Sequence, residues 1–187
     1  MEKSISSPAK GEYRAFPNIE SRNSRQENME IPMVVKFMDV RQGLRILEVG
    51  CGRGIALPPL FELCQPKRLA GIDVDETLVE KARQRVQGLA IDAEIIHGDV
   101  RDMPFPDNAF DLVIDFGTCY HIARPEAALK EISRVLDVNG EFIYETPINQ
   151  FFSHPVRSYG RRIPWNVCPE FKTVRRRLLW NKSTKLL

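Results

Sequence analysis

The chain has 187 residues, of which 43% are hydrophobic and 28% are charged, as in a globular protein with one domain and a substantial core. This composition excludes wholesale disorder, and no run of about 18 apolar residues is present to form a membrane-spanning helix. The net charge of +2 is unevenly distributed, because residues 151–187 hold nine Lys or Arg against one acid. The part before them is therefore acidic.

Residues 1–26 are polar and lack an apolar period, which predicts a flexible N-terminal segment or lid. We expect residues 27–187 to form a single domain, with a core over 44–145 and a basic, proline-containing segment over 146–187. The first residues show no apolar run typical of a signal peptide, which predicts a cytoplasmic protein. The four cysteines are scattered without a CxxC pair, so we expect reduced thiols and no metal site.

Along the chain, the apolar pattern predicts alternating helices and strands. A helix is expected over 27–40, followed by strands over 44–49, 69–72, 93–96, 111–114 and 141–145. Between them, helices are expected over 55–64, after an Asp75 N-cap up to Gly88, and from Pro125 until Asn139-Gly140 stops the last one. This alternation predicts an α/β fold with a doubly wound, mostly parallel, Rossmann-like sheet. Ligands of such sheets bind at the carboxyl ends of the strands.

Glycines follow the first predicted strand, whose last residues are Glu48 and Val49. The turn reads Gly50, Cys51, Gly52, Arg53 and Gly54. Glycines at alternate positions allow a sharp turn and a close ligand approach, and Glu48 is placed to meet a cationic group. The dinucleotide-binding GxGxxG pattern does not fit, because Ile55 follows Gly54. On its own, the pattern is also typical of a tight strand–helix turn.

Acids also follow the second and third predicted strands. Asp73 suits hydrogen bonds from two ribose hydroxyls, whereas Asp75 is better placed to cap the next helix. Asp99 lies in a polar loop and could accept from an adenine amino group, with Met103 and Phe105 packed on the ring. Taken alone, this third cluster reads as a polar loop.

The three clusters together, in this order and spacing, resemble the class I S-adenosylmethionine-dependent methyltransferases, especially the small-molecule branch that includes the quinone-biosynthesis enzymes. The resemblance runs from about 44 to 145 and includes Phe105-Pro106-Asp107-Asn108-Ala109-Phe110-Asp111 and Leu129-Lys130-Glu131-Ile132-Ser133-Arg134-Val135-Leu136. It implies the fold, the cofactor S-adenosylmethionine and the product S-adenosylhomocysteine.

The resemblance also implies a set of cofactor-binding residues. Glu48 and the backbone of 50–54 would hold the methionine part and Asp73 the ribose, and Val74 also belongs to the cofactor-binding set. Asp99 and Val100 would read the adenine, and Asp115 with Phe116 would line the methionine and face the acceptor. Only 42 residues follow Glu145, which leaves room for shortened or rebuilt last strands.

Methyl transfer chiefly requires alignment of the acceptor, so a base is needed only when the attacking atom must lose a proton. Candidate bases are His121, Tyr120 and Glu145, although the first two also suit a role in lining the loop after the fourth strand. We expect a small-molecule acceptor, which the basic C-terminal segment would suit if it is anionic. The alternatives are a non-enzymatic cofactor-binding partner subunit and an RNA methyltransferase that grips phosphates with the same segment.

Overall fold

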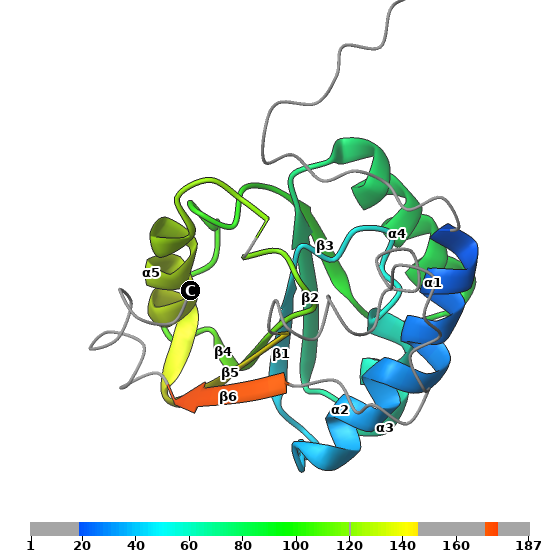
Figure 1. The fold of residues 1–187 in the computed structure, drawn as a ribbon, viewed down its shortest axis with the longest axis horizontal. Coiled ribbons are helices and arrows are strands. Elements are labelled where there is room, and N and C mark those ends of the chain that lie inside the picture. The colour runs from blue at the N-terminus through cyan, green and yellow to red at the C-terminus, as the bar shows by residue number, and fades with distance from the viewer. Residues whose placement is uncertain (1–18, 120, 146–170, 176–187) are drawn as a thin grey trace, which may run out of the picture.

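The computed structural model describes residues 19–119, 121–145 and 171–175 of the chain. From residue 45 onward, helices are interspersed among its strands (Figure 1). In chain order they are α1 (Ile19–Arg25), the π-helix η1 (Gln26–Glu30), α2 (Ile31–Phe37), β1 (Arg45–Val49), α3 (Leu57–Cys64), β2 (Arg68–Asp73), α4 (Glu76–Gly88), β3 (Glu94–His97), β4 (Phe110–Asp115), α5 (Pro125–Val135), β5 (Leu136–Glu145) and β6 (Phe171–Arg175).

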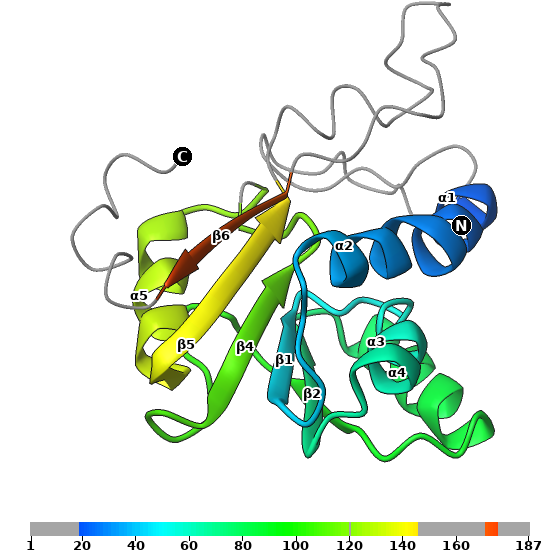
Figure 2. The same cartoon turned by 90° about the horizontal axis from the view of Figure 1, so that it is seen from below.

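The six strands form one sheet in the order β3-β2-β1-β4-β5-β6. The first five are parallel, and β6 runs antiparallel to β5. Helices α2, α3 and α4 lie on one face and α5 on the other, as Figure 2 shows. The predicted doubly wound, mostly parallel fold is therefore confirmed. The strand order reverses between β1 and β4, where ligands of this architecture bind.

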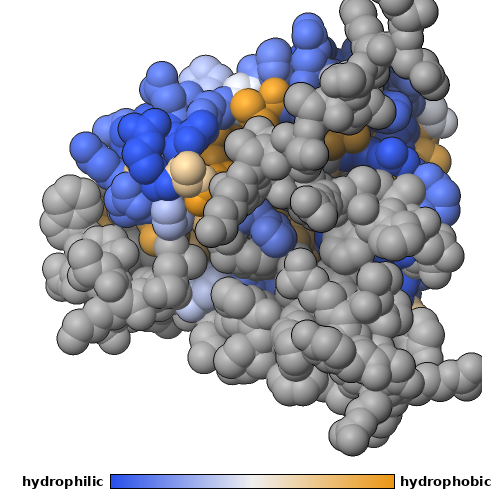
Figure 3. Space-filling model, turned by 45° about the horizontal axis from the view of Figure 1, so that its top comes forward, coloured by the Kyte–Doolittle hydropathy of each residue, from blue (hydrophilic) through white to orange (hydrophobic). Residues whose placement is uncertain are grey.

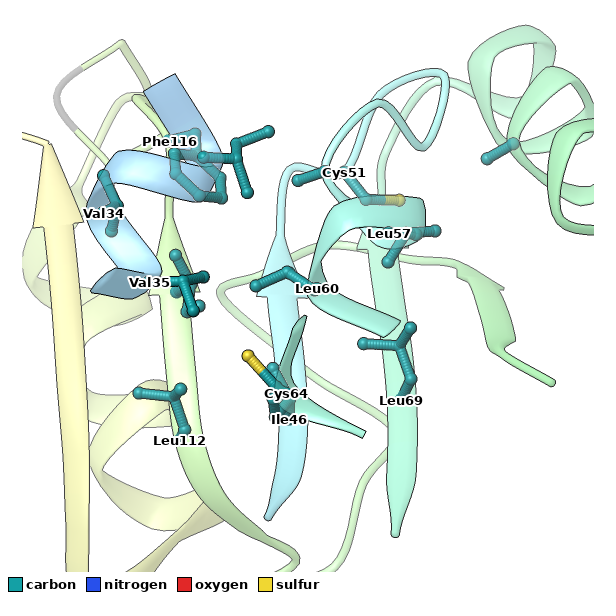
Figure 4. Close-up of a cluster of buried hydrophobic side chains, with 14 of the residues drawn as sticks. Val34, Val35, Ile46, Cys51, Leu57, Leu60, Cys64, Leu69, Leu112 and Phe116 are labelled. Atoms are coloured by element: carbon teal, nitrogen blue, oxygen red, sulfur yellow. The ribbon is translucent and has the colours of Figure 1, made fainter. Parts of the chain in front are cut away.

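Two hydrophobic layers sandwich the sheet, because apolar side chains of its buried strands point alternately to either face. The layer beneath α2, α3 and α4 is drawn in Figure 4, where side chains of β1, β2 and β4 meet those of the helices. It includes Val34, Val35, Ile46, Leu57, Leu60, Leu69 and Leu112. The opposite layer joins Leu47, Val49 and Phe110 to Ile132 of α5.

The N-terminal helical segment starts earlier than predicted, at Ile19 rather than residue 27. Residues 19–26, expected to be flexible, are therefore helical, and the rest of that expectation concerns 1–18, outside the described residues. A π turn interrupts the segment, and the Ile31 N–H donates to the Gln26 carbonyl. Arg25 and Glu30, which form an ion pair, are also five residues apart, as are the donor and acceptor of a π-helix hydrogen bond.

Helix α3 begins two residues later than predicted, at Leu57, and the predicted cap of α4 is confirmed. Pro58 and Pro59 lie in the first turn of α3, where N–H groups have no helical acceptor, so neither proline breaks a bond. Asp75 caps α4, since its Oδ1 accepts from the N–H groups of Thr77 (2.9 Å) and Leu78 (3.1 Å).

The boundary between α5 and β5 differs from the prediction. The helix ends at Val135 instead of continuing to Asn139-Gly140. Leu136 adopts an extended backbone and pairs with Phe110 of β4, and the register then shifts so that Leu112 pairs with Glu141. Burial of Leu136 in the layer beside α5 therefore outweighs the turn signal of Asn139-Gly140.

The described surface is mostly hydrophilic on the face drawn in Figure 3, with a smaller hydrophobic area. Exposed large hydrophobic side chains are scattered over several elements: Met29, Phe37, Leu63, Val74, Leu89 and Val138. Among the described residues, no helix has the length and apolarity needed to cross a membrane.

Candidate active site

The glycine turn after β1 is held against the end of β2. The N–H groups of Gly50 and Cys51 both donate to the Ile72 carbonyl, at 2.8 and 3.1 Å. Gly50 and Gly52 have positive φ angles of 67° and 52°, a conformation that favours glycine. Around Gly52, a Cβ would meet no atom within 4 Å, so the turn leaves open space on this side.

The loop after β4 packs against this glycine turn. A Cβ at Gly50 would lie 1.7 Å from the Thr118 Oγ1, and the Thr118 hydroxyl donates to the Val49 carbonyl at 3.2 Å. Glycine at position 50 is therefore required both by its backbone conformation and by the approach of Thr118. Sequence reasoning missed Thr118, because nothing in its neighbourhood marks a partner 68 residues away.

Asp115 shapes this loop from inside. Its carboxylate is 1% exposed and accepts from the N–H groups of Gly117 (2.8 Å), Thr118 (2.5 Å) and Cys119 (3.0 Å). The sequence placed Asp115 and Phe116 in the cofactor set. In the structure, the Asp115 carboxylate faces its own loop, and Phe116 is 9% exposed within the layer beneath α2.

Asp73, at the end of β2, is hydrogen-bonded both to the glycine turn and to the start of α4. Its Oδ2 accepts from the Gly52 N–H at 2.8 Å, and its Oδ1 from the Asp75 N–H at 2.9 Å. Because a carboxylate has about four acceptor positions, Asp73 retains capacity for two more donors. Val74, beside it, is one of the exposed hydrophobic residues.

Glu48 lies between the two acids just described, on the central strand β1. Its side chain is buried, with a residue exposure of 4%, and the Oε2 atom has no hydrogen-bond partner in the described part of the chain. Burial, followed by the charges of Asp73 and Asp115, raises the pKa of Glu48 well above its ordinary value. Such a carboxyl is complementary to a cationic group of a ligand.

Past β3, Asp99 accepts hydrogen bonds from Arg101, a partner that was not predicted from the sequence. The Arg101 guanidinium donates to Asp99 Oδ1 at 2.9 Å and to Oδ2 at 2.5 Å, and its Nη1 reaches the Ala123 carbonyl at 3.2 Å. The Arg101 side-chain bond holds the pKa of Asp99 below its usual range. Val100 is buried nearby. The spacing of two residues between Asp99 and Arg101 is the sequence feature that could have predicted this ion pair.

Met103 and Phe105 differ from the expectation that they pack on an adenine ring. Both are 4% exposed and belong to the layer beside α5, where the Phe105 ring meets Phe110 edge to face at 5.0 Å. Arg134 of α5 fixes this loop, donating to the carbonyls of Met103 (2.9 Å) and Phe105 (2.7 Å). The loop is therefore part of the core.

Of the candidate bases, His121 and Glu145 are described and Tyr120 lies outside the described residues. The His121 N–H donates to the Thr118 carbonyl at 2.9 Å, which places His121 on the loop after β4. Glu145 is the last residue of β5 and is buried, with 7% exposure. Both lie at the same edge of the sheet as Glu48, since carboxyl ends of parallel strands share that edge (Figure 2).

Ion pairs join the N-terminal helical segment to the glycine turn and to α4. Arg53 of the glycine turn donates to Glu20 of α1 at 3.1 Å, and Arg85 of α4 pairs with Glu27 of the π-helix. The first of these contacts joins α1 directly to the turn that carries Gly52.

A comparison with known families gives a match to the model described as a methyltransferase domain, over residues 47–144. The chain belongs to this family. The matched residues run from β1 to β5 and contain the ends of β1, β2, β3 and β4 described above. Within the described residues, the methyltransferase domain has no cluster of His, Cys, Asp and Glu suited to a metal ion.

Relatives of the methyltransferase domain carry similar names. It is 35% identical over 105 residues to a fatty-acid O-methyltransferase of Mycolicibacterium smegmatis, covering 55% of this chain and 37% of that protein. It is 33% identical over 138 residues to a demethylmenaquinone methyltransferase of Staphylococcus aureus, covering 68% and 56%. The domain thus spans between a third and somewhat over half of the curated relatives' length.

Among solved structures, the methyltransferase domain is similar to a SAM-dependent methyltransferase from Aquifex aeolicus, with a TM-score of 0.60, 27% identity and 65% of each chain covered. The class I assignment and S-adenosylmethionine as the cofactor, both expected from the resemblance, are thereby confirmed.

Proposed function

We propose that this domain catalyses transfer of a methyl group from S-adenosylmethionine to a small-molecule acceptor. The observation that carries the proposal is the convergence of Glu48, the glycine turn and Asp73 at one edge of the sheet, within a matched methyltransferase domain. The names of the two curated relatives, one acting on a fatty acid and one on a quinone precursor, favour a small-molecule acceptor.

The residues present fit the cofactor chemically. The cationic amino group suits the buried Glu48 carboxyl, whose Oε2 lacks a partner among the described residues, and open space at Gly52 admits a ligand beside the turn. The ribose diol suits the two remaining acceptor positions of Asp73. Gly50, Cys51 and Gly54 complete the turn, and Val74 is the exposed residue that follows Asp73.

For the adenine, the proposal retains Asp99 and Val100 at the end of β3. Both oxygens of Asp99 accept bonds from Arg101, so a contact with the adenine amino group requires this pair to loosen. Comparing Asp99→Asn with Arg101→Met tests the assignment. If Asp99 accepts from the adenine amino group, Asp99→Asn weakens binding of S-adenosylhomocysteine. Arg101→Met does not weaken it, because this substitution leaves the Asp99 carboxylate available.

The sulfonium of the cofactor supplies an activated methyl group, so this chain's task is to bind and align the acceptor. The described residues support alignment, because Asp115 and Thr118 fix the loop that would line the methionine together with Phe116. If the acceptor atom must lose a proton, we propose His121 or Glu145 as the base among the described residues, with Tyr120 as a third candidate.

The acceptor's charge is a further part of the proposal. The segment 151–187 is basic, and Arg157, Arg161 and Arg162 follow β5 in the chain, so an anionic acceptor such as a carboxylate would suit them. These arginines lie outside the described residues. A raised acceptor KM in the triple Arg→Gln variant, with unchanged melting, would support this part.

The test is methyl transfer from labelled S-adenosylmethionine to fatty acids, demethylated quinones and total RNA, offered separately. Transfer to one of the small-molecule classes supports the proposal. Transfer only to RNA would replace it with the nucleic-acid reading, and cofactor binding without transfer to any class would favour a non-enzymatic partner subunit. The glycine-turn variant Gly50→Ala serves as the control for background transfer.

A further inference from the structure

Glu48 is an ionisable residue inside a fully buried stretch of β1. Its neighbours in β1, namely Ile46, Leu47 and Val49, are all 0% exposed, and its partners across the strands are Gly71 and Ile114. The Glu48 Oε2 atom is buried and has no hydrogen-bond partner in the described part of the chain. In an ionised Glu48, this oxygen would lack a donor of the kind that buried charges require.

The groups that face Glu48 are themselves acidic or neutral. Asp73 approaches from β2 and Asp115 from β4, and these two acids are the charges that act on Glu48 among the described residues. The Cys51 thiol lies in the glycine turn, and burial raises its pKa, so it stays neutral. Asp115 is held by three N–H groups of its own loop and offers no donor.

We propose that Glu48 is a neutral carboxylic acid in the free protein and gives up its proton when the cationic amino group of the cofactor binds, so that cofactor binding releases one proton. This inference rests on the proposed function, because it takes S-adenosylmethionine or its product as the ligand. The proton leaves the Glu48 carboxyl for solvent, and the ligand's ammonium group supplies the positive charge that the described residues around Glu48 lack. The buried acid cluster thereby couples cofactor affinity to pH.

The sign of the coupling follows from the two states. In the free protein, the pKa of Glu48 is raised, and an adjacent ammonium group lowers it in the complex. Affinity for S-adenosylhomocysteine is therefore full above the free-protein pKa and falls about tenfold for each pH unit below it, until the pKa of the complex is reached. The amino group of the ligand stays charged throughout this range.

Titration calorimetry with S-adenosylhomocysteine in buffers of different ionisation enthalpy, between pH 5 and 8, counts the protons released. We expect a release approaching one proton at the lower pH values. The probe 5′-methylthioadenosine, which lacks the amino acid part, is expected to bind without this release. Glu48→Gln should bind S-adenosylhomocysteine with no proton release and with affinity independent of pH, while the matched control His97→Gln should release as the unaltered chain does.

Three outcomes overturn the inference and leave the proposed function intact: binding of S-adenosylhomocysteine without proton release, a release that persists in Glu48→Gln, or an equal release with 5′-methylthioadenosine. Failure of S-adenosylhomocysteine to bind at any pH would instead contradict the proposed function itself. If Glu48→Gln does not fold, the inference is tested on the unaltered chain by comparing the proton release with S-adenosylhomocysteine and with 5′-methylthioadenosine.

Discussion

Thr118 occupies the place that a side chain at Gly50 would need. A Cβ at position 50 would lie 1.7 Å from the Thr118 Oγ1, which itself donates to the Val49 carbonyl at 3.2 Å. The loop after β4 is thereby locked to the turn after β1, at the point where the strand order reverses. The contact of Thr118 with Val49 and Gly50 therefore joins the segment proposed to bind the cofactor to the loop proposed to face the acceptor.

This contact makes the effect of Gly50→Ala predictable. The substitution forces an alanine into a positive φ of 67° and into Thr118, which we expect to cost about 2–4 kcal/mol of unfolding free energy from conformational strain and overpacking together. Gly52→Ala is the matched control, since its φ is 52° but its Cβ meets open space, so only the strain of about 1–2 kcal/mol applies. Denaturant unfolding of both variants measures the difference, and equal losses would contradict the role of Thr118.

For Asp73→Asn, we expect S-adenosylhomocysteine to bind about ten- to hundredfold more weakly, because a charged acceptor is worth about 1.5–3 kcal/mol. The asparagine oxygen can still accept from the Gly52 N–H, whereas its amide group cannot accept from the Asp75 N–H, so the variant should also lose about 1 kcal/mol of stability. Asp75→Ala is the companion variant. It removes the cap of α4 and should cost about 1 kcal/mol of stability while leaving ligand affinity unchanged. Normal affinity in a folded Asp73→Asn protein would refute the ribose assignment.

Arg134 is expected to be a determinant of stability. It pairs with Glu131 at 2.7 Å and donates to two loop carbonyls, so Arg134→Met should lower the unfolding free energy by about 1–3 kcal/mol at neutral pH.

The same pair predicts a pH dependence. Its bond with Arg134 holds the pKa of Glu131 below the ordinary value, so the carboxylate contributes stability above that ordinary value, and this contribution is lost as the pH falls through the lower, folded-state pKa. The difference in unfolding free energy between the unaltered chain and Arg134→Met should therefore shrink on acidification. A difference that stays constant down to pH 3 would show that the carbonyl bonds alone carry the effect.

His121→Ala tests the candidate base. If His121 takes a proton from the acceptor, turnover should fall by about 10²–10⁴ while the affinity for S-adenosylhomocysteine stays the same. His121→Gln provides a comparison that keeps side-chain bulk on the loop. A loss of threefold or less in both variants would leave His121 with a structural role and direct attention to Glu145.

Much of the fold could be predicted from the sequence, because its signals are local. Strands β1, β2, β3 and β4 lie within one or two residues of their predicted ranges, and the Asp75 cap formed as expected. The end of α5 could not be predicted, because the turn signal of Asn139-Gly140 competes with the pairing of Leu136 against Phe110, a partner distant in the chain.

By itself, the sequence determined the strand–helix alternation, the glycine turn after β1 and the acids at the strand ends, since these depend on periodicity and on backbone conformations open to few residue types. Only the tertiary structure decided how those residues are used. In the structure, the Asp115 carboxylate accepts hydrogen bonds from its own loop, and the Asp99 carboxylate accepts from Arg101. Phe105 is buried in the core. The Glu48 Oε2 is without a partner among the described residues. Each of these outcomes depends on which side chains meet across strands and loops when the sheet packs, and local patterns do not specify those meetings.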